Sequence, residues 1–527
     1  MISGTNAIGN KASKQGERTF KTFDPKNNEN TEWTFYEATT NEINEAVALA
    51  TDAYAVYKDY SGEKKAEFLE AIADEIEALG DELINTYCRE SGLPQGRAVG
   101  ERGRTMGQLR AFATLIKQGS WVEAVIEKAQ PDREPLRKSD IRKMLFPLGP
   151  VVVFGASNFP LAFSTAGGDT ASALAAGCPV IVKSHPMHAG TGELVSSAII
   201  KAAKRTGMPN GVFSNLNSGG IEVGQQLVKH PKVKAVGFTG SIHGGTALYK
   251  LANERDEPIP VFAEMGSINP VVLLPSALEQ EGDTWATKYA SSITLGSGQF
   301  CTNPGLILGV QGEHLNEFID TLSKEILKLE PTTMLHPNIY AKYVEGKKEL
   351  SEQDGVVITA EYKNDVKVNS GQPLILKVSG SDFLANTKLH KEVFGPFSIV
   401  VMCKDGAEME DIINHLEGQL TGTILGSEEE LELNAGVVDA LKGRVGRILF
   451  NGVPTGVEVN SSMVHGGPYP ASTDSRFTSV GTSAIRRWVR PLSYQDWPNR
   501  LLPEALKNEN PLGITRLVEG VYTNTEI

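Results

Sequence analysis

The stretch Pro150-Val-Val-Val-Phe-Gly155 is an apolar run that ends at a glycine, and Pro179-Val-Ile-Val-Lys183 repeats this pattern after a helix-like segment. Two further strand-like runs, 212–216 and 235–239, follow, each with a helix-like segment behind it. Apolar strands joined by helices form a parallel sheet that is covered on both faces. We therefore expect a doubly wound α/β domain here, and such domains bind nucleotides at the carboxyl ends of their strands.

The segments before this domain follow other patterns. Apolar residues recur every three to four positions over 42–79, which indicates two amphipathic helices, and a second helix pair is expected over 81–91 and 94–119. Residues 1–40 are polar and turn-rich, so an irregular arm or short hairpins are expected there.

A second doubly wound α/β unit is expected to begin near Ile259, because strand-like and helix-like runs alternate again from there. The tail contains a β-like segment and aromatic residues with no evident place in either sheet, which suits contact with a partner subunit. The expected boundaries are 1–131 and 149–258 for the nucleotide-binding domain, 259–455 for the second domain, 456–485 for a return to the first, and 132–148 with 486–527 for oligomerisation or bridging segments.

Composition and charge limit the class of protein. The chain has 527 residues and a net charge of −13, which argues against nucleic acid or an anionic membrane as the main partner. Its four cysteines are far apart and have no metal-ligand spacing, so we expect free thiols in a reducing compartment and no metal site. Neither a signal peptide nor a run of ~20 apolar residues is evident, and a cytoplasmic protein is expected.

One cysteine lies where a reactive group would be presented. In Thr294-Leu-Gly-Ser-Gly-Gln-Phe-Cys301-Thr-Asn-Pro-Gly305, glycines loosen the backbone before the thiol, and Pro304 and Gly305 end the turn. Such a loop can bring the sulfur and its own amide N–H to one point, where the thiolate is the attacking species. The alternative is that Cys301 is simply a small apolar side chain.

Two other motifs contain side chains that could assist such a thiol. Asn158 follows a strand in Gly155-Ala-Ser-Asn158-Phe-Pro160 and could donate an N–H to a developing oxyanion, although it could also be an ordinary turn residue. Glu264 ends the run Val261-Phe-Ala-Glu264, where partial desolvation would suit a general base. A structural salt bridge is the alternative for Glu264.

Two more motifs suit a nucleotide. In Phe238-Thr-Gly240-Ser241, a glycine turn before a helix exposes backbone amides to a pyrophosphate, but the G-x-G-x-x-G spacing is missing and an ordinary βα turn is the alternative. In Glu392-Val-Phe394-Gly-Pro396, the carboxylate could hold ribose hydroxyls while the ring positions a planar heterocycle; a plain turn is the alternative.

Together with Cys301, and in this order, these motifs closely resemble the aldehyde dehydrogenase superfamily from about Glu42 to the end of the chain. The resemblance implies a nucleotide-binding and a catalytic α/β domain, a small β element for oligomerisation, and a homodimer or homotetramer. It also implies that Cys301 is the nucleophile, that Asn158 and the Cys301 amide form the oxyanion hole, and that Glu264 is the base.

The same resemblance implies a nicotinamide coenzyme. The implied contacts are Lys183 for the adenine ribose, Gly240 and Ser241 for the pyrophosphate, and Glu392 and Phe394 for the nicotinamide half. Many relatives have an acidic residue three positions after the lysine, but this chain reads Lys183-Ser-His185-Pro186. A carboxylate there would repel a 2′-phosphate, so its absence permits NADP, with Lys183 and His185 as donors. NAD remains possible, and His185 could instead only pack.

Three stretches narrow the resemblance to the 2,5-dioxopentanoate (α-ketoglutaric semialdehyde) dehydrogenases of bacterial sugar-acid catabolism: 296–305, Val464-His-Gly-Gly-Pro-Tyr-Pro-Ala471 and 486–502. The implied reaction is NAD(P)-dependent oxidation of the semialdehyde to 2-oxoglutarate through a thiohemiacetal and a thioester. The carboxylate of this substrate needs a cation, for which we predict Arg104, assisted by Ser461 and Ser462. A solvated helix face is the alternative for the arginines of that helix.

Three other functions would suit parts of the same sequence. An NADP-linked dehydrogenase for fatty aldehydes or for succinic- or glutaric-type semialdehydes would use the same chemistry. A cofactor-independent thiol hydrolase would need a histidine partner for Cys301, and no histidine is placed in the sequence so as to suggest one. A non-catalytic protein on the same fold finds no support in the intact set of Cys301, Glu264 and Asn158.

Overall fold

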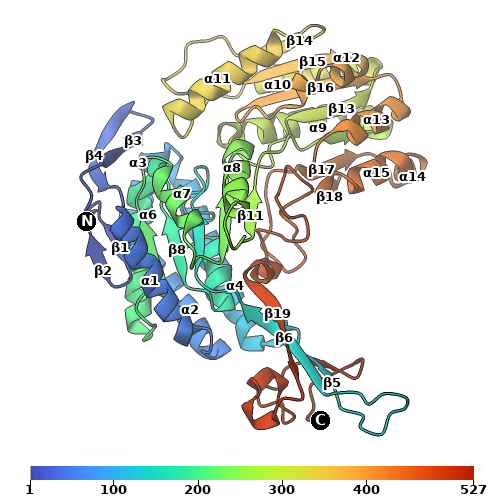
Figure 1. Cartoon of the computed structure of the whole chain (residues 1–527). Helices are drawn as coiled ribbons and strands as arrows, with labels where there is room; N and C mark the ends of the chain where they lie inside the picture. Colours follow the sequence, from blue (N-terminus) through green and yellow to red (C-terminus); the bar gives the residue numbers. More distant parts are fainter. Residues whose placement is uncertain (1) are drawn as a thin grey trace.

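The computed structural model describes residues 2–527. Two α/β units lie against each other, and a β arm projects away from the first unit (Figure 1). The expectation of two doubly wound α/β domains and a small β element is confirmed. No helix within the described residues is both long and apolar enough to span a bilayer.

The first unit is built on a seven-stranded sheet in the order β11-β10-β7-β8-β9-β1-β2. The strands from β11 to β9 are parallel, and the N-terminal β1 and β2 extend the sheet in antiparallel pairing. The strand bounds are Asn6–Ile8 (β1), Lys11–Ser13 (β2), Val151–Phe154 (β7), Val180–Lys183 (β8), Phe213–Leu216 (β9), Ala235–Thr239 (β10) and Val261–Glu264 (β11). Residues Thr19–Asp24 (β3) and Glu29–Tyr36 (β4) form a separate hairpin, so the expected short hairpins are present.

Helices cover both faces of this sheet. The two expected N-terminal helix pairs are confirmed, and the first of these helices begins with a capping box in which Thr39 and Glu42 satisfy each other's backbone N–H groups. The helices are Thr40–Tyr57 (α1), Gly62–Ala78 (α2), Gly80–Ser91 (α3), Gln95–Gln118 (α4), Gly168–Ala176 (α5), Ala189–Arg205 (α6), Glu222–Lys229 (α7) and Ile242–Asn253 (α8).

The expected boundary at residue 259 is wrong for one strand. Val261–Glu264 pairs in parallel with β10, so β11 is the edge strand of the first sheet. The returning segment lies against the same strand, because Met265 N–H donates to the Ala471 carbonyl and Ser472 bridges to Glu264. The sequence of an apolar strand does not indicate which sheet the strand joins. The chain crosses to the second unit only after Glu264.

The second unit contains a seven-stranded sheet in the order β14-β15-β16-β13-β12-β17-β18, parallel except for β14. Its strands are Val271–Leu273 (β12), Leu306–Val310 (β13), Val357–Glu361 (β14), Leu374–Ser379 (β15), Phe397–Cys403 (β16), Gln419–Leu425 (β17) and Val445–Phe450 (β18). Its helices are Pro275–Thr294 (α9), Glu313–Ile326 (α10), Pro337–Ser351 (α11), Gly380–Ala385 (α12), Gly406–His415 (α13), Glu428–Leu433 (α14) and Ala435–Lys442 (α15).

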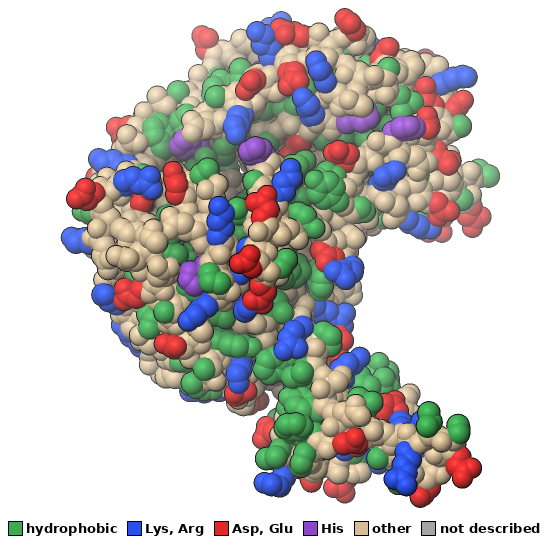
Figure 2. Space-filling model, viewed as in Figure 1, with side chains coloured by type: hydrophobic (Ala, Val, Ile, Leu, Met, Phe, Trp, Pro, Cys, Tyr) green, Lys and Arg blue, Asp and Glu red, His purple; other side chains and the backbone are tan. Residues whose placement is uncertain are grey.

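The arm is a five-stranded sheet in the order β19-β6-β5-β20-β21. Its strands are Val125–Glu127 (β5), Ile141–Pro147 (β6), Val489–Gln495 (β19), Arg516–Val518 (β20) and Val521–Thr523 (β21). The β-like tail segment therefore has a partner in its own chain, since β19 pairs with β6 along its whole length. β5 belongs to the arm too, so the arm starts earlier than residue 132. Figure 2 shows apolar side chains on the arm and a hollow between it and the second unit.

Candidate active site

Cys301 lies in the turn that follows α9, where a short 3₁₀ segment, Leu295–Gly298, leads into the loop. Gly298 has a φ of +65°, and a side-chain carbon there would lie 2.2 Å from the Gly395 backbone. Only glycine fits this position, because both the conformation and the close approach exclude a Cβ. The Cys301 side chain is half-buried, so its sulfur is placed by a rigid turn and still open to a small reactant.

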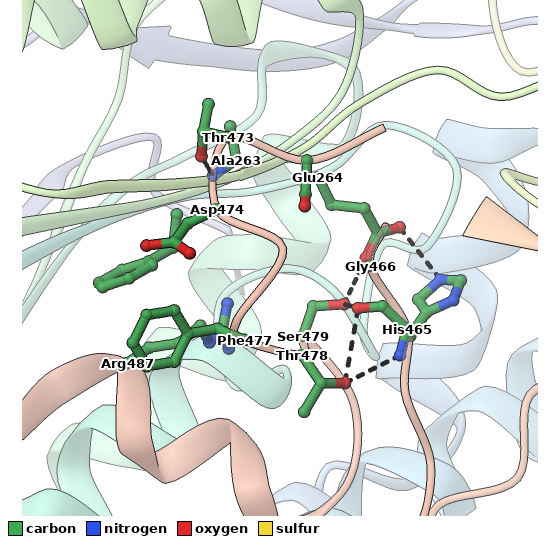
Figure 3. Close-up of a pocket in the computed structure, with 12 residues that line it drawn as sticks. Ala263, Glu264, His465, Gly466, Thr473, Asp474, Phe477, Thr478, Ser479 and Arg487 are labelled. Carbon is green, nitrogen blue, oxygen red and sulfur yellow. Dashed lines mark hydrogen bonds and ion pairs between the residues drawn. The ribbon is translucent and has the colours of Figure 1, made fainter. Parts of the chain in front are cut away.

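A histidine bridges Cys301 and Glu264. The Cys301 sulfur lies 3.3 Å from Nε2 of His465, and the same nitrogen lies 3.0 Å from Oε1 of Glu264. Glu264 comes from the end of β11 and His465 from the segment that returns to the first unit. Ser479 donates its hydroxyl to the other Glu264 oxygen, and Figure 3 shows Glu264, His465 and Ser479 facing one another.

Burial and charge set the protonation of this pair. Burial works against a charged His465, but the Glu264 carboxylate and Cys301 outweigh it and raise the pKa of His465 to about 10. Burial likewise works against a charged Glu264, but His465 and the Ser479 hydroxyl hold the pKa of Glu264 below its usual value. At neutral pH the pair is therefore an imidazolium and a carboxylate, with the imidazolium against the sulfur.

The three donor atoms lie within 4.8 Å of one another, a spacing that a metal ion could also use. A thiol, a carboxylate and an imidazole in contact are also the groups that nucleophilic and acid–base chemistry uses.

The sequence prediction missed His465. No histidine could be singled out from the sequence as a partner of Cys301, because 164 residues separate the two side chains along the chain although only 3.3 Å separates their atoms. His465 does stand in the motif Val464-His-Gly-Gly that carried the subfamily resemblance. The motif carried the resemblance to the subfamily but gave no indication that His465 contacts Cys301.

Asn158 lies in the loop after β7, at the carboxyl end of the first sheet. Its side-chain amide donates to the Gln299 carbonyl at 3.1 Å, which brings the amide to the loop of Cys301. Glu101 fixes the same region by accepting the N–H groups of Leu161 and Ala162. The structure therefore brings Asn158, Glu264 and Cys301 into one region at the junction of the two units.

The predicted adenine contacts lie at the carboxyl end of β8. Lys183 ends the strand, and burial lowers its pKa to about 8 against the opposing influence of Glu37. The His185 ring stacks on His188 at 5.1 Å, and its Nδ1 accepts the Met187 N–H. Burial, His188 and Lys183 hold the pKa of His185 well below its usual value, so the ring is neutral and its Nε2 carries the proton.

The predicted pyrophosphate contacts lie between β10 and α8. Ser241 caps the helix by accepting the Gly244 N–H, and Gly240 precedes it. A side-chain carbon at Gly240 would lie 2.7 Å from the Phe238 ring, so this position of the turn has no room for a side chain. The exposed first turn of a helix, with its free N–H groups, suits a phosphate.

Glu392 and Phe394 line a pocket together with Ser267, Phe300 and Asn303. Burial raises the pKa of Glu392 to about 7, although the Ser267 N–H opposes the shift. A side-chain carbon at Gly266 would lie 2.5 Å from a Glu392 oxygen, so the carboxylate approaches the backbone that follows β11. Turns that carry no side chain, with polar groups at both ends of this region, fit a dinucleotide.

The three residues predicted to bind the substrate carboxylate, Arg104, Ser461 and Ser462, lie in different surroundings. Arg104 is half-buried on α4, donates to the Val457 carbonyl at 2.7 Å and lies over the Phe163 ring, so it is not part of a solvated face. Ser461 and Ser462 are exposed on the loop 454–463, and the structure records no side-chain contact from either to Cys301.

Residues 11–479 match the model of the aldehyde dehydrogenase family. The chain belongs to this family. It is 49% identical to alpha-ketoglutaric semialdehyde dehydrogenase 2 of Azospirillum brasilense over 99% of both chains, and 45% identical to alpha-ketoglutaric semialdehyde dehydrogenase of Acinetobacter baylyi over 94% of both. Its fold is similar to that of a Staphylococcus aureus betaine aldehyde dehydrogenase in complex with NAD⁺ (TM-score 0.80, 19% identity, 94% and 98% of the two chains). The aldehyde dehydrogenase described here is thus an oxidoreductase that uses a nicotinamide coenzyme, as the resemblance implied.

Proposed function

We propose that this aldehyde dehydrogenase oxidises 2,5-dioxopentanoate to 2-oxoglutarate. The observation that carries the proposal is the contact chain Cys301–His465–Glu264 at the junction of the two units, with the half-buried Arg104 close enough for Cys301 to act on its charge. The two relatives at 45–49% identity, both alpha-ketoglutaric semialdehyde dehydrogenases, support the choice of substrate.

The protein's part in the reaction follows from these groups. The imidazolium of His465 stabilises a thiolate at Cys301, which attacks the aldehyde carbon. The Asn158 amide and the Cys301 N–H stabilise the oxyanion that forms. A nicotinamide coenzyme, held by the residues proposed below, would supply the hydride acceptor for this oxidation. Glu264, held by His465 and Ser479, then takes a proton from the water that releases the acid from the Cys301 sulfur.

We propose NADP as the preferred coenzyme. Lys183 and His185 would face the adenine ribose, Gly240 and Ser241 the pyrophosphate, and Glu392 with Phe394 the nicotinamide half. The support is that no acidic residue follows Lys183 on its loop, where the chain reads Ser-His185-Pro186; the carboxylate that acts on Lys183 is Glu37, from another segment.

We also propose that the arm joins two or four copies. Its exposed apolar residues would be covered in an oligomer, among them Leu136, Trp497, Leu501, Val521 and Tyr522. Light scattering of the purified protein would give the number of copies, and a monomer at micromolar concentration would contradict this.

One experiment tests substrate and coenzyme together. The purified enzyme is assayed with 2,5-dioxopentanoate, succinic semialdehyde, glutaric semialdehyde and hexanal, each with NAD and with NADP. The proposal expects the highest kcat/KM for 2,5-dioxopentanoate, and a higher value with NADP than with NAD. A preference for hexanal or for the simple semialdehydes would overturn the substrate assignment, and a preference for NAD would overturn the coenzyme assignment.

A further inference from the structure

Two arginines lie near Cys301 without an acidic partner. Arg104 is on α4 and Arg447 is on β18, so they approach from different units. No carboxylate among residues 2–527 lies within ion-pair distance of either guanidinium, and Cys301 is the anion that acts most strongly on both. Two half-buried arginines therefore lack an ion-pair partner among the described residues, although Glu101 and Glu264 act on the charge of Arg104 from further away.

Both arginines donate to the same loop. Arg104 Nη1 donates to the Val457 carbonyl at 2.7 Å, and Arg447 Nη2 donates to the Pro454 carbonyl at 2.9 Å. These bonds aim the two planar groups at the loop 454–463 and fix their orientation.

The hydrogen bonds to the loop leave several N–H donors of the two guanidinium groups unpaired. Nε and Nη2 of Arg104 and Nε of Arg447 are buried and have no acceptor. A buried guanidinium N–H without an acceptor costs free energy, and native structures rarely retain one without a function. The unpaired N–H donors of the two guanidinium groups therefore suit an anion with several oxygen atoms. The other end of that molecule would carry the aldehyde group that reacts at Cys301.

We propose that Arg104 and Arg447 form one subsite for the 2-oxo acid end of the substrate. One guanidinium binds the carboxylate and the other the neighbouring 2-oxo oxygen, which gives the spare donors their acceptors. This inference rests on the proposed function and adds Arg447 to it as a residue that determines specificity. A simple aldehyde leaves the donors unpaired, and a site built for hydrogen bonds rejects such analogues strongly.

The alternative role for Arg447 is structural, because its bonds to Pro454 and Gly456 also brace the loop. The two roles predict different kinetics. A bracing residue affects all aldehydes alike, whereas a recognition residue affects only substrates that carry the groups it binds.

The first experiment compares Arg447→Met and Arg104→Met with the wild-type enzyme on 2,5-dioxopentanoate, succinic semialdehyde and hexanal. Arg102→Met, on the same helix as Arg104 but outside the subsite, is the matched control. Each subsite variant is expected to lose about 10- to 100-fold in kcat/KM on 2,5-dioxopentanoate, mostly through KM, and to lose much less on hexanal, which carries neither of the groups that the arginines bind. Equal losses on all three aldehydes, or an unchanged preference in Arg447→Met, would overturn the inference.

The second experiment needs no variant and covers the case in which Arg447→Met does not fold. With hexanal as the substrate of the wild-type enzyme, 2-oxoglutarate and glutarate are compared as inhibitors, since they differ only in the 2-oxo group. Inhibition at least about 10-fold stronger by 2-oxoglutarate is expected. Equal inhibition would overturn the subsite even if 2,5-dioxopentanoate remains the best substrate. If 2,5-dioxopentanoate is not preferred at all, the proposed function fails first.

Discussion

Replacing His465 with phenylalanine removes the cation that lies between Cys301 and Glu264. At 3.0 Å and an effective dielectric constant of ~20, the attraction between the imidazolium and the carboxylate is roughly 5 kcal/mol. Losing one partner of a buried pair typically costs about 3–5 kcal/mol. Since His465 holds the pKa of Glu264 down, that pKa is expected to rise in the variant until Glu264 is protonated near neutral pH.

The variant should therefore be slow and should depend on pH differently. We expect kcat at neutral pH to fall about 10²- to 10³-fold, which corresponds to ~3–4 kcal/mol of barrier. Activity should partly recover at higher pH as Glu264 loses its proton, so the acid limb of the kcat profile moves upward. In the wild-type enzyme the imidazolium should persist until pH approaches the His465 pKa of about 10, and activity should fall beyond it.

The assay is coenzyme reduction as a function of pH, combined with the rate at which iodoacetamide modifies Cys301. His465→Gln keeps an N–H donor and should retain more activity than His465→Phe. His415→Phe, an exposed histidine on α13, is the control and should match the wild type. If His465→Phe keeps the wild-type kcat, pH profile and alkylation rate, the contact chain has no part in the reaction and the reasoning is refuted.

Three further substitutions test the remaining assignments. Glu264→Gln should lower steady-state turnover about 10²- to 10⁴-fold but leave a burst of one coenzyme reduced per site, seen by stopped flow; no burst would place Glu264 before acyl release. Asn158→Ala should cost about 10²- to 10³-fold in kcat with little change in KM, and a pure KM effect would argue against the oxyanion role. Lys183→Ala should raise the KM for NADP more than that for NAD. Because the lysine has a pKa of about 8, the wild-type KM for NADP should also rise above pH 8 as the ammonium loses its proton, and a flat profile would contradict this.

Several elements could be predicted because their cause is local. The runs at 150–155 and 179–183 are apolar throughout, which suits strands buried on both faces, and they became β7 and β8. The periodic segment 42–79 became two helices, and Thr39 with Glu42 shows why the first one starts where it does. Composition and period decide such elements whatever the rest of the chain does.

Other features depended on which segments meet. Val261–Glu264 reads as a strand in either unit, and only its pairing with β10 assigns it to the first sheet. The β19 segment had no evident partner in the sequence, yet β6 pairs with it in register. Strand propensity describes a pleated, half-buried residue and contains no information on the neighbouring strand.

The sequence by itself determined the fold class, the family resemblance and the glycine-rich turn around Cys301, because glycine turns and apolar runs act within a few residues. Only the tertiary structure decided that His465 contacts both Cys301 and Glu264, and that Arg447 and Arg104 donate to the same loop. The physical reason is the short range of these interactions. A hydrogen bond or ion pair works over about 3–4 Å, and residues far apart in the chain reach that distance only after two sheets and a returning segment have packed together.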